Sequence, residues 1–176
     1  MAVIGAGAAG LVAAIFAASR GADVVLIERT ADGGRKILIR GGGRCNILPS
    51  VLAPERFVTG SPAHLMRGML KAWPLREQRA FFEDDLGIPL ALEEESGKLF
   101  PKSDRARDVR DGLVSLARAR GVRLQFGTSV TGLSGLPSLM IYTLRVPDPP
   151  ALGDLEGTRM VEGDSTSALP PAPSDK

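Results

Sequence analysis

The chain of 176 residues contains one cysteine and one histidine. Because a disulfide needs two cysteines, none can form within the chain, and a Cys-x-x-Cys metal motif is excluded as well. Cys45 and His64 together provide too few ligands for a zinc site built from cysteine and histidine. The chain is therefore neither a disulfide-stabilised scaffold nor a zinc finger, and we expect no metal site.

Aromatic residues are also scarce, at 5% of the chain. Proteins that bind single-stranded nucleic acid stack the bases on aromatic side chains, and few aromatic residues accompany the arginines between Arg35 and Arg44. Acidic and basic residues are interleaved elsewhere, and the formal net charge is only +2. A solvated mixed surface without a nucleic-acid partner is the expectation, and RNA binding by this basic stretch is kept as the last of three hypotheses.

The chain opens on an apolar run, MAVIGAGAAGLVAAIFAASRG. No basic residues precede this run, as they would in a signal peptide, and its glycines are spaced for another purpose. We therefore expect a cytoplasmic protein with no membrane span. The composition leaves the oligomeric state open.

The glycines of GAGAAG follow a short apolar stretch, 2–5, at the spacing G-x-G-x-x-G. In a strand-to-helix turn of this kind, Gly5 makes the tight turn, Gly7 lets the backbone approach a pyrophosphate, and Gly10 allows close packing of the helix on the strand. The helix N-terminus then offers unpaired N–H groups and the positive end of its dipole to the phosphates. A glycine-rich packing turn without a ligand is the alternative.

The residues that follow provide the context this fingerprint needs. A helix is predicted over 11–20, with Gly21 as its stop signal, and a buried parallel strand over 23–28. The strand ends at Glu28, 18 residues beyond Gly10, which is near the spacing of an acid that binds ribose hydroxyls. We therefore predict an α/β fold, a Rossmann-like FAD/NAD(P)-binding domain with a parallel sheet.

A second glycine-rich segment, 29–46, follows where a simple NAD-binding domain would place another helix and strand. Its glycine density predicts no helix, and a loop so near the first site favours FAD. The run RGGGRCN predicts an anion-binding loop, in which Arg44 pairs with phosphate and Asn46 bonds the ribityl chain or the ring edge. Cys45 is interpreted as a small buried residue beside the cofactor, with a reactive thiol of lowered pKa as the alternative.

Five stretches carry a family resemblance: VIGAGAAGL, LIER, GGRKILIRGGGRCN, GIPLALEEESGKLFPKSDRARDV and GVRLQFGTSVTGL. They resemble the FAD-dependent oxidoreductases of the BaiN/YhiN type over residues 2–133, although Arg40 stands where such proteins often have serine. The resemblance implies a glutathione-reductase-like fold, FAD as cofactor, NAD(P)H as electron donor and a small organic substrate. It assigns no catalytic side chain, because the flavin carries the hydride chemistry.

The resemblance also implies which residues bind the cofactor. It assigns 5–10 to the pyrophosphate and Glu28 to the adenosine ribose. It assigns Arg35, Lys36 and 42–46 to the flavin side, and a strand at Val130 to the adenine. The full set is Gly5, Ala6, Gly7, Ala8, Ala9, Gly10, Glu28, Arg29, Arg35, Lys36, Gly42, Gly43, Arg44, Cys45, Asn46 and Val130.

The middle of the chain, at about 50–103, is predicted as an excursion of helices and a hairpin. Apolar side chains at helical spacing predict helices within 56–73 and over 75–87, and we expect Leu65, Met69 and Trp73 to lie in the core rather than to contact a cofactor. A hairpin is predicted over 88–101.

A helix over 104–120, capped by Ser103 or Asp104, and a strand over 122–133 return the chain to the sheet. These elements complete an expected FAD-binding unit over 1–133. One extra strand is expected within 134–146 and a disordered tail over 147–176. Flavoproteins of the family are more than twice as long, so we expect an incomplete fold, truncated after about residue 133. The alternative function is a truncated, non-catalytic ADP- or FAD-binding remnant.

Overall fold

The computed structural model describes residues 1–57, 60, 62–136 and 139–145. Strand β1 (Ala2–Ile4), helix α1 (Ala8–Ser19) and strand β2 (Val25–Ile27) form the predicted βαβ unit. The strands pair in parallel, with Val3 opposite Leu26. Strand β6 (Arg123–Gln125) pairs in parallel with the other edge of β2, so the sheet has the order β1-β2-β6. The predicted Rossmann-like parallel sheet is confirmed.

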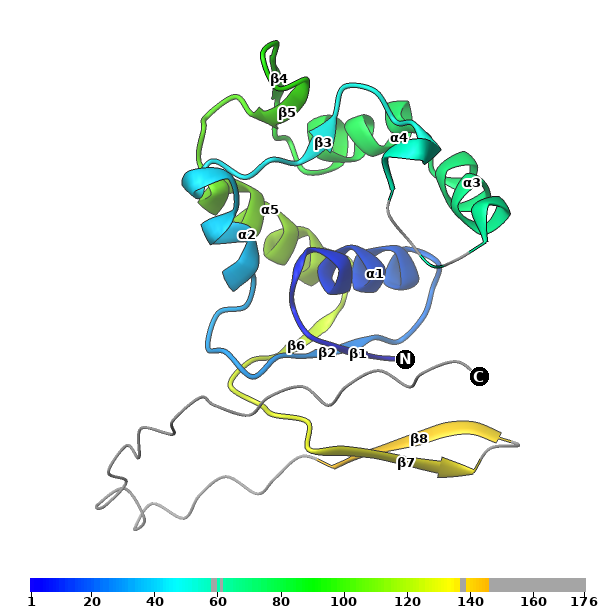
Figure 1. Cartoon of the computed structure of the whole chain (residues 1–176). Coiled ribbons are helices and arrows are strands. Elements are labelled where there is room, and N and C mark those ends of the chain that lie inside the picture. The colour runs from blue at the N-terminus through cyan, green and yellow to red at the C-terminus, as the bar shows by residue number, and fades with distance from the viewer. Residues whose placement is uncertain (58–59, 61, 137–138, 146–176) are drawn as a thin grey trace, which may run out of the picture.

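Helix α1 packs on this sheet through three buried side chains, Leu11, Ala14 and Ile15. Helix α5 (Ala106–Ala119) contacts α1 and lies on the same side of the sheet (Figure 1). Both helices belong to one hydrophobic core, which also includes Leu26 of β2.

The glycine-rich segment after β2 corrects one prediction, because it contains a short helix, α2 (Arg35–Ile39). The glycines lie at its two ends, at 33–34 and 41–43, while the residues between them contain no glycine and can form helical turns. A 3-10 turn, η1 (Arg40–Gly43), follows, with Gly41 and Gly42 in the left-handed region at φ +59° and +64°. The glycines therefore mark the two ends of this helix and do not prevent it from forming.

A second, antiparallel sheet lies beyond α2 and α5, away from the parallel sheet (Figure 1). Its strands are β3 (Leu48–Pro49), β4 (Leu90–Glu93) and β5 (Lys98–Pro101), in the order β3-β5-β4. Strands β4 and β5 form the hairpin predicted over 88–101.

Helical segments connect β3 to β4 within this second sheet: η2 (Pro54–Arg56), α3 (Ala63–Ala72), α4 (Leu75–Ala80) and a π-helical turn, η3 (Phe81–Asp85). Trp73 and Phe81 pack with Phe16 of α1, with the Phe16 and Trp73 ring centroids 5.2 Å apart. Leu65 and Met69, by contrast, are 47% and 65% exposed. Their predicted core position is wrong for this structure, because α3 buries none of its side chains.

Helix α5 buries Val109 and Leu113, which lie one helical turn apart. Its N-cap is Arg105, with no side-chain capping bond, so the cap predicted at Ser103 or Asp104 is wrong. Asp104 instead has φ +54°, a turn conformation that short acidic side chains tolerate better than most.

The strand predicted over 122–133 is shorter than expected, because β6 ends at Gln125 and an irregular segment follows. Strands β7 (Gly132–Leu136) and β8 (Leu139–Arg145) then pair as an antiparallel hairpin. The tail predicted over 147–176 lies outside the described residues.

Candidate functional site

The glycine turn between β1 and α1 exposes the N-terminus of the helix. Gly5 takes φ +94° and donates its N–H to the carbonyl oxygen of Ile27 at 2.8 Å, which fixes the turn to β2. Gly7 is the N-cap and has no side chain with which to cap the helix. The first N–H groups of a helix have no partner within it, so 8–10 present donors and the positive dipole end to the cavity that they line.

Gly7 and Gly10 differ in whether the fold itself requires a glycine at that position. A Cβ atom at Gly10 would lie 1.9 Å from the carbonyl oxygen of Gly5, so the packing of α1 on the turn itself requires glycine there. A Cβ atom at Gly7 would meet no atom within 4 Å, and Gly7 has an ordinary φ of −76°. The folded chain therefore does not require glycine at position 7, and the space beside it is open to a ligand.

Glu28 lies at the end of β2 and connects the turn to the next loop. Its carboxylate accepts hydrogen bonds from the N–H of Ala6 at 2.8 Å, and from the N–H and hydroxyl of Thr30, both at 2.9 Å. Burial by itself raises the pKa of Glu28, but the hydrogen bonds from Thr30 and Ala6 outweigh it and lower the pKa below its usual value. Glu28 is therefore an ionised acceptor held in a fixed orientation.

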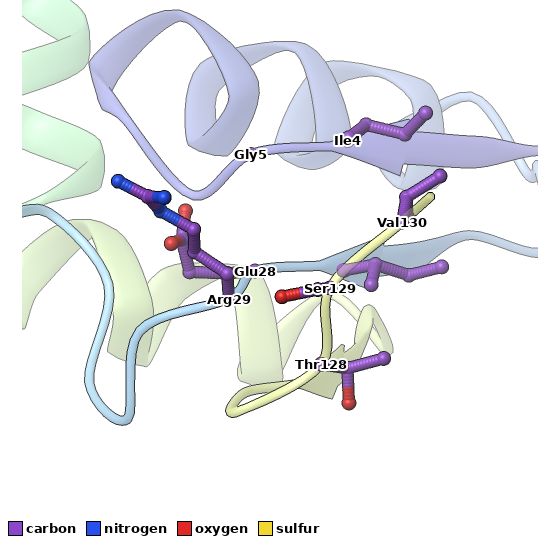
Figure 2. Close-up of a pocket in the computed structure, with 8 residues that line it drawn as sticks. Ile4, Gly5, Glu28, Arg29, Thr128, Ser129 and Val130 are labelled. Carbon is purple, nitrogen blue, oxygen red and sulfur yellow. The ribbon is translucent and has the colours of Figure 1, made fainter. Parts of the chain in front are cut away.

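A cavity of about 380 Å³ lies at the carboxyl ends of β1 and β2. Figure 2 shows the apolar side chains of Ile4 and Val130 at one end, and Glu28 and Arg29 at the other. Val130 belongs to the irregular segment after β6 and not to a strand, which corrects the prediction for that residue. One end of this cavity is therefore apolar and the other end is charged.

Two further cavities continue around the glycine turn. One, of about 280 Å³, is lined by charged residues of the second loop and includes Gly7 and Glu28. The other, of about 560 Å³, lies between the first turn of α1 and the second loop. The predicted residues that line one or both are Gly5, Gly7, Ala8, Ala9, Gly10, Glu28, Arg29, Arg35, Lys36, Cys45 and Asn46.

The structure places four predicted residues outside the linings of these three cavities. Ala6 is fully buried beneath the turn, and Gly42 and Gly43 lie in the 3-10 turn η1. Arg44 points to the hairpin: its guanidinium pairs with Glu93 at 2.9 Å and lies 4.3 Å from the centroid of the Phe100 ring. Arg44 therefore contacts the hairpin and does not face the cavity. This position differs from its predicted role as a phosphate ligand.

Cys45 lies in the cavity between the two loops and is 7% exposed. Its φ is +66°, a conformation that costs a non-glycine residue of order 1 kcal/mol or more and that clusters at functional sites. Its burial agrees with the small-residue interpretation.

Sequence reasoning missed two features of the site. Thr30 orients Glu28 through two hydrogen bonds, and a hydroxyl two residues after an acid at a strand end is a signal that could have found it. Arg110 of α5 pairs with Asp32 in the loop after Glu28. Since 78 residues separate the two, no local pattern predicts that contact.

Comparison with a protein-family model gives a match over residues 1–142, to the family described as HI0933-like protein Rossmann domain. The match extends nine residues beyond the sequence resemblance, which ends at residue 133. No helix among the described residues is both long enough and apolar enough to cross a membrane.

Two characterised relatives are similar in sequence. The 3-dehydro-bile acid delta(4,6)-reductase of Clostridium scindens is 32% identical over 133 residues, which are 74% of this chain and 32% of the reductase. The ribosomal RNA dihydrouridine synthase of Escherichia coli is 42% identical over 60 residues, 34% of this chain and 15% of the synthase. The chain thus spans about a third or less of the length of these relatives.

A solved structure shares the fold. The 3-ketosteroid-delta4-(5alpha)-dehydrogenase of Rhodococcus jostii superposes with a TM-score of 0.54 and 18% identity, over 75% of this chain and 38% of the dehydrogenase.

Proposed function

The chain belongs to the HI0933-like family, the FAD-dependent oxidoreductases of the BaiN/YhiN type, and we propose that it binds FAD at the glycine turn. The observation that carries the proposal is the open space at Gly7. It lies beside a helix N-terminus with unpaired donors and faces the second loop, which brings basic side chains. A pyrophosphate has the charge and the acceptor oxygens that this arrangement favours.

The residues around the turn suit the ADP half of FAD. The N–H groups of 8–10 would hold the pyrophosphate, and Arg35 and Lys36, which line the cavities around the turn, would neutralise its charge. The ionised Glu28 would accept hydrogen bonds from the adenosine ribose. The apolar end of the first cavity, with Ile4 and Val130, would receive the adenine.

The third cavity would lead towards the flavin. It extends from the first turn of α1 to Cys45 and Asn46, where the Asn46 amide can bond ribityl hydroxyls or the ring edge. When bound, FAD supplies hydride transfer, and the protein supplies binding, orientation and exclusion of water. We assign no acid or base among the described side chains.

The substrate we propose is an organic molecule with a carbon–carbon double bond to be reduced. The two relatives support this class: one is named as a delta(4,6)-reductase of a bile acid, and the other makes dihydrouridine, which is uridine with one carbon–carbon double bond reduced. NAD(P)H is the electron donor we propose, and a small molecule is favoured over RNA because few aromatic residues accompany the basic loop.

Visible spectroscopy of the purified chain with added FAD tests this function. We expect the protein to retain FAD through gel filtration, with flavin absorbance in the protein peak. Anaerobic NADPH or NADH should then bleach that absorbance, and a substrate with a conjugated double bond should restore it. Retention of FAD without bleaching would favour the alternative, a nucleotide-binding module without turnover. A colourless protein that takes up no FAD would contradict the proposal.

A further inference from the structure

Arg110 of α5 reaches across to the loop that follows Glu28. Its guanidinium Nη1 lies 2.9 Å from a carboxylate oxygen of Asp32, and its Nε pairs with the neighbouring Asp111. The Arg110 side chain is only 11% exposed, whereas Asp32 is 62% exposed. A buried guanidinium held by two carboxylates is fixed in place, and it fixes the loop in turn.

The aliphatic part of Arg110 packs on the backbone of that loop. A Cβ atom at Gly34 would lie 2.3 Å from Cγ of Arg110, so the stem of the arginine occupies the space where a side chain would be. Gly34 has φ +67° and donates its N–H to the carbonyl oxygen of Ala6 at 2.8 Å. Arg110 therefore supports the residue that joins the second loop to the centre of the glycine turn.

Gly34 also precedes the two basic residues of α2 that line the charged cavity. Its carbonyl oxygen accepts the N–H of Ile37 at 2.8 Å, which starts α2. Gly34, Arg35 and Lys36 line the charged cavity together with Glu28. A shift of Gly34 would therefore move the basic residues away from the turn.

We propose that Arg110 is a positioning residue of the nucleotide site. Through Asp32 and Gly34 it holds the loop 29–36 against the glycine turn, and so strengthens the binding of a pyrophosphate without contacting it. A loop that is ordered before the ligand arrives loses less conformational entropy on binding. The inference rests on the proposed function for the identity of the ligand, while the ordering of the loop is a property of the ligand-free chain.

Two variants and one control test this role. Arg110→Met keeps an unbranched apolar stem against Gly34 but removes both ion pairs, and Asp32→Asn removes one pair at an exposed position. Arg120→Met is the matched control, because Arg120 follows the same helix and pairs with Asp85 at 3.3 Å, outside the linings of the three cavities. Each full-length variant is compared with the wild type in ADP affinity by calorimetry, in melting temperature, and in hydrogen exchange of backbone amides without ligand.

We expect Arg110→Met to weaken ADP binding roughly three- to tenfold, because a buried guanidinium loses its charge-assisted hydrogen bonds. Asp32→Asn should weaken it less, about two- to threefold, because Asp32 is exposed. We expect the Gly34 amide to exchange faster in both. Arg120→Met should match the wild type in both measurements. Wild-type ADP affinity and wild-type exchange at Gly34 in Asp32→Asn would overturn the proposal. Faster exchange spread over all of α5, with unchanged ADP affinity, would also overturn it and make the pair a general stabilising contact.

Failure of the proposed function gives a different result. If the wild type binds neither ADP nor FAD, the assignment of the ligand is wrong. The exchange of the Gly34 amide in the ligand-free variants then still decides whether Arg110 orders the loop.

Discussion

The N–H of Ala6 donates a 2.8 Å hydrogen bond to the carboxylate of Glu28, which joins the glycine turn to the end of the next strand. Ala6 is fully buried beneath the turn, and its carbonyl oxygen accepts the N–H of Gly34 from the second loop. One residue therefore connects the three segments that line the cavities.

This connection predicts a pH-dependent loss of stability in Glu28→Gln. The neutral amide accepts weaker hydrogen bonds, so we expect the free energy of unfolding to fall by about 1 kcal/mol at neutral pH. Because folding lowers the pKa of Glu28 below 4.5, the stabilisation is complete above that value and is lost as the pH falls through the lower, folded-state pKa.

Urea denaturation at a series of pH values measures this difference. Glu94→Gln, a change at an exposed carboxylate in the hairpin turn, controls for the loss of one charge. A difference between Glu28→Gln and the wild type that stays constant down to the most acidic pH would show that ionisation of Glu28 does not stabilise the fold.

Gly10→Ala tests the packing of α1 on the turn. Since the new Cβ would lie 1.9 Å from the Gly5 carbonyl oxygen, the helix has to move, and we expect a loss of about 3 kcal/mol in the free energy of unfolding. Gly7→Ala is the matched control, because its Cβ has open space, and it should lose less than about 1 kcal/mol. Chemical denaturation compares the two, and equal losses would show that the turn adapts to a side chain at either position.

Arg44→Leu tests whether Arg44 acts through the hairpin. The pKa of Glu93 is lowered first by the hydrogen bond from the Ser96 hydroxyl and second by Arg44, so in the variant it should rise only part of the way to its ordinary value. FAD affinity should stay within about twofold of the wild type, because a partly exposed ion pair stabilises little. NMR titration of Glu93 and a flavin binding assay check this. A far larger loss of FAD affinity, with the hairpin intact, would make Arg44 a direct ligand.

Cys45→Ser tests the thiol. The substitution preserves size in a buried position, and we expect FAD affinity within about threefold of the wild type and a loss of about 1 kcal/mol in the free energy of unfolding. Fluorescence titration and thermal unfolding provide the comparison. A variant that holds flavin and has lost all turnover would assign a chemical role to the thiol.

The sequence predicts the βαβ unit, the hairpin and α5 because their signals are local: glycine spacing, alternation and helical periodicity. It also predicts most residues that line the cavities, since Glu28 and the glycines of 5–10 follow one another closely along the chain. The short helix α2 is not predicted, because the glycine content of the whole segment hides the glycine-free stretch 35–40.

Contacts between distant segments could not be predicted. Arg44 pairs with Glu93, and Arg110 with Asp32, across large separations in the sequence. The neighbouring sequence does not distinguish either arginine from other charged residues. Only the folded structure shows whether an arginine pairs with a distant carboxylate or faces the phosphate site. Leu65 and Met69 show the reverse: their helical spacing indicates an apolar face, but periodicity does not say whether another element covers it.

We propose that the space beside Gly7 receives the pyrophosphate of FAD. Titration of the wild type and of Gly7→Val with FAD, followed by flavin fluorescence and competed with ADP, tests it most directly, with circular dichroism to verify that both are folded. We expect saturable binding by the wild type that ADP displaces, and an affinity at least about tenfold weaker in the folded Gly7→Val protein, because the valine side chain would fill the space of the ligand. Equal FAD affinity in the two proteins, or no binding by the wild type, would contradict it.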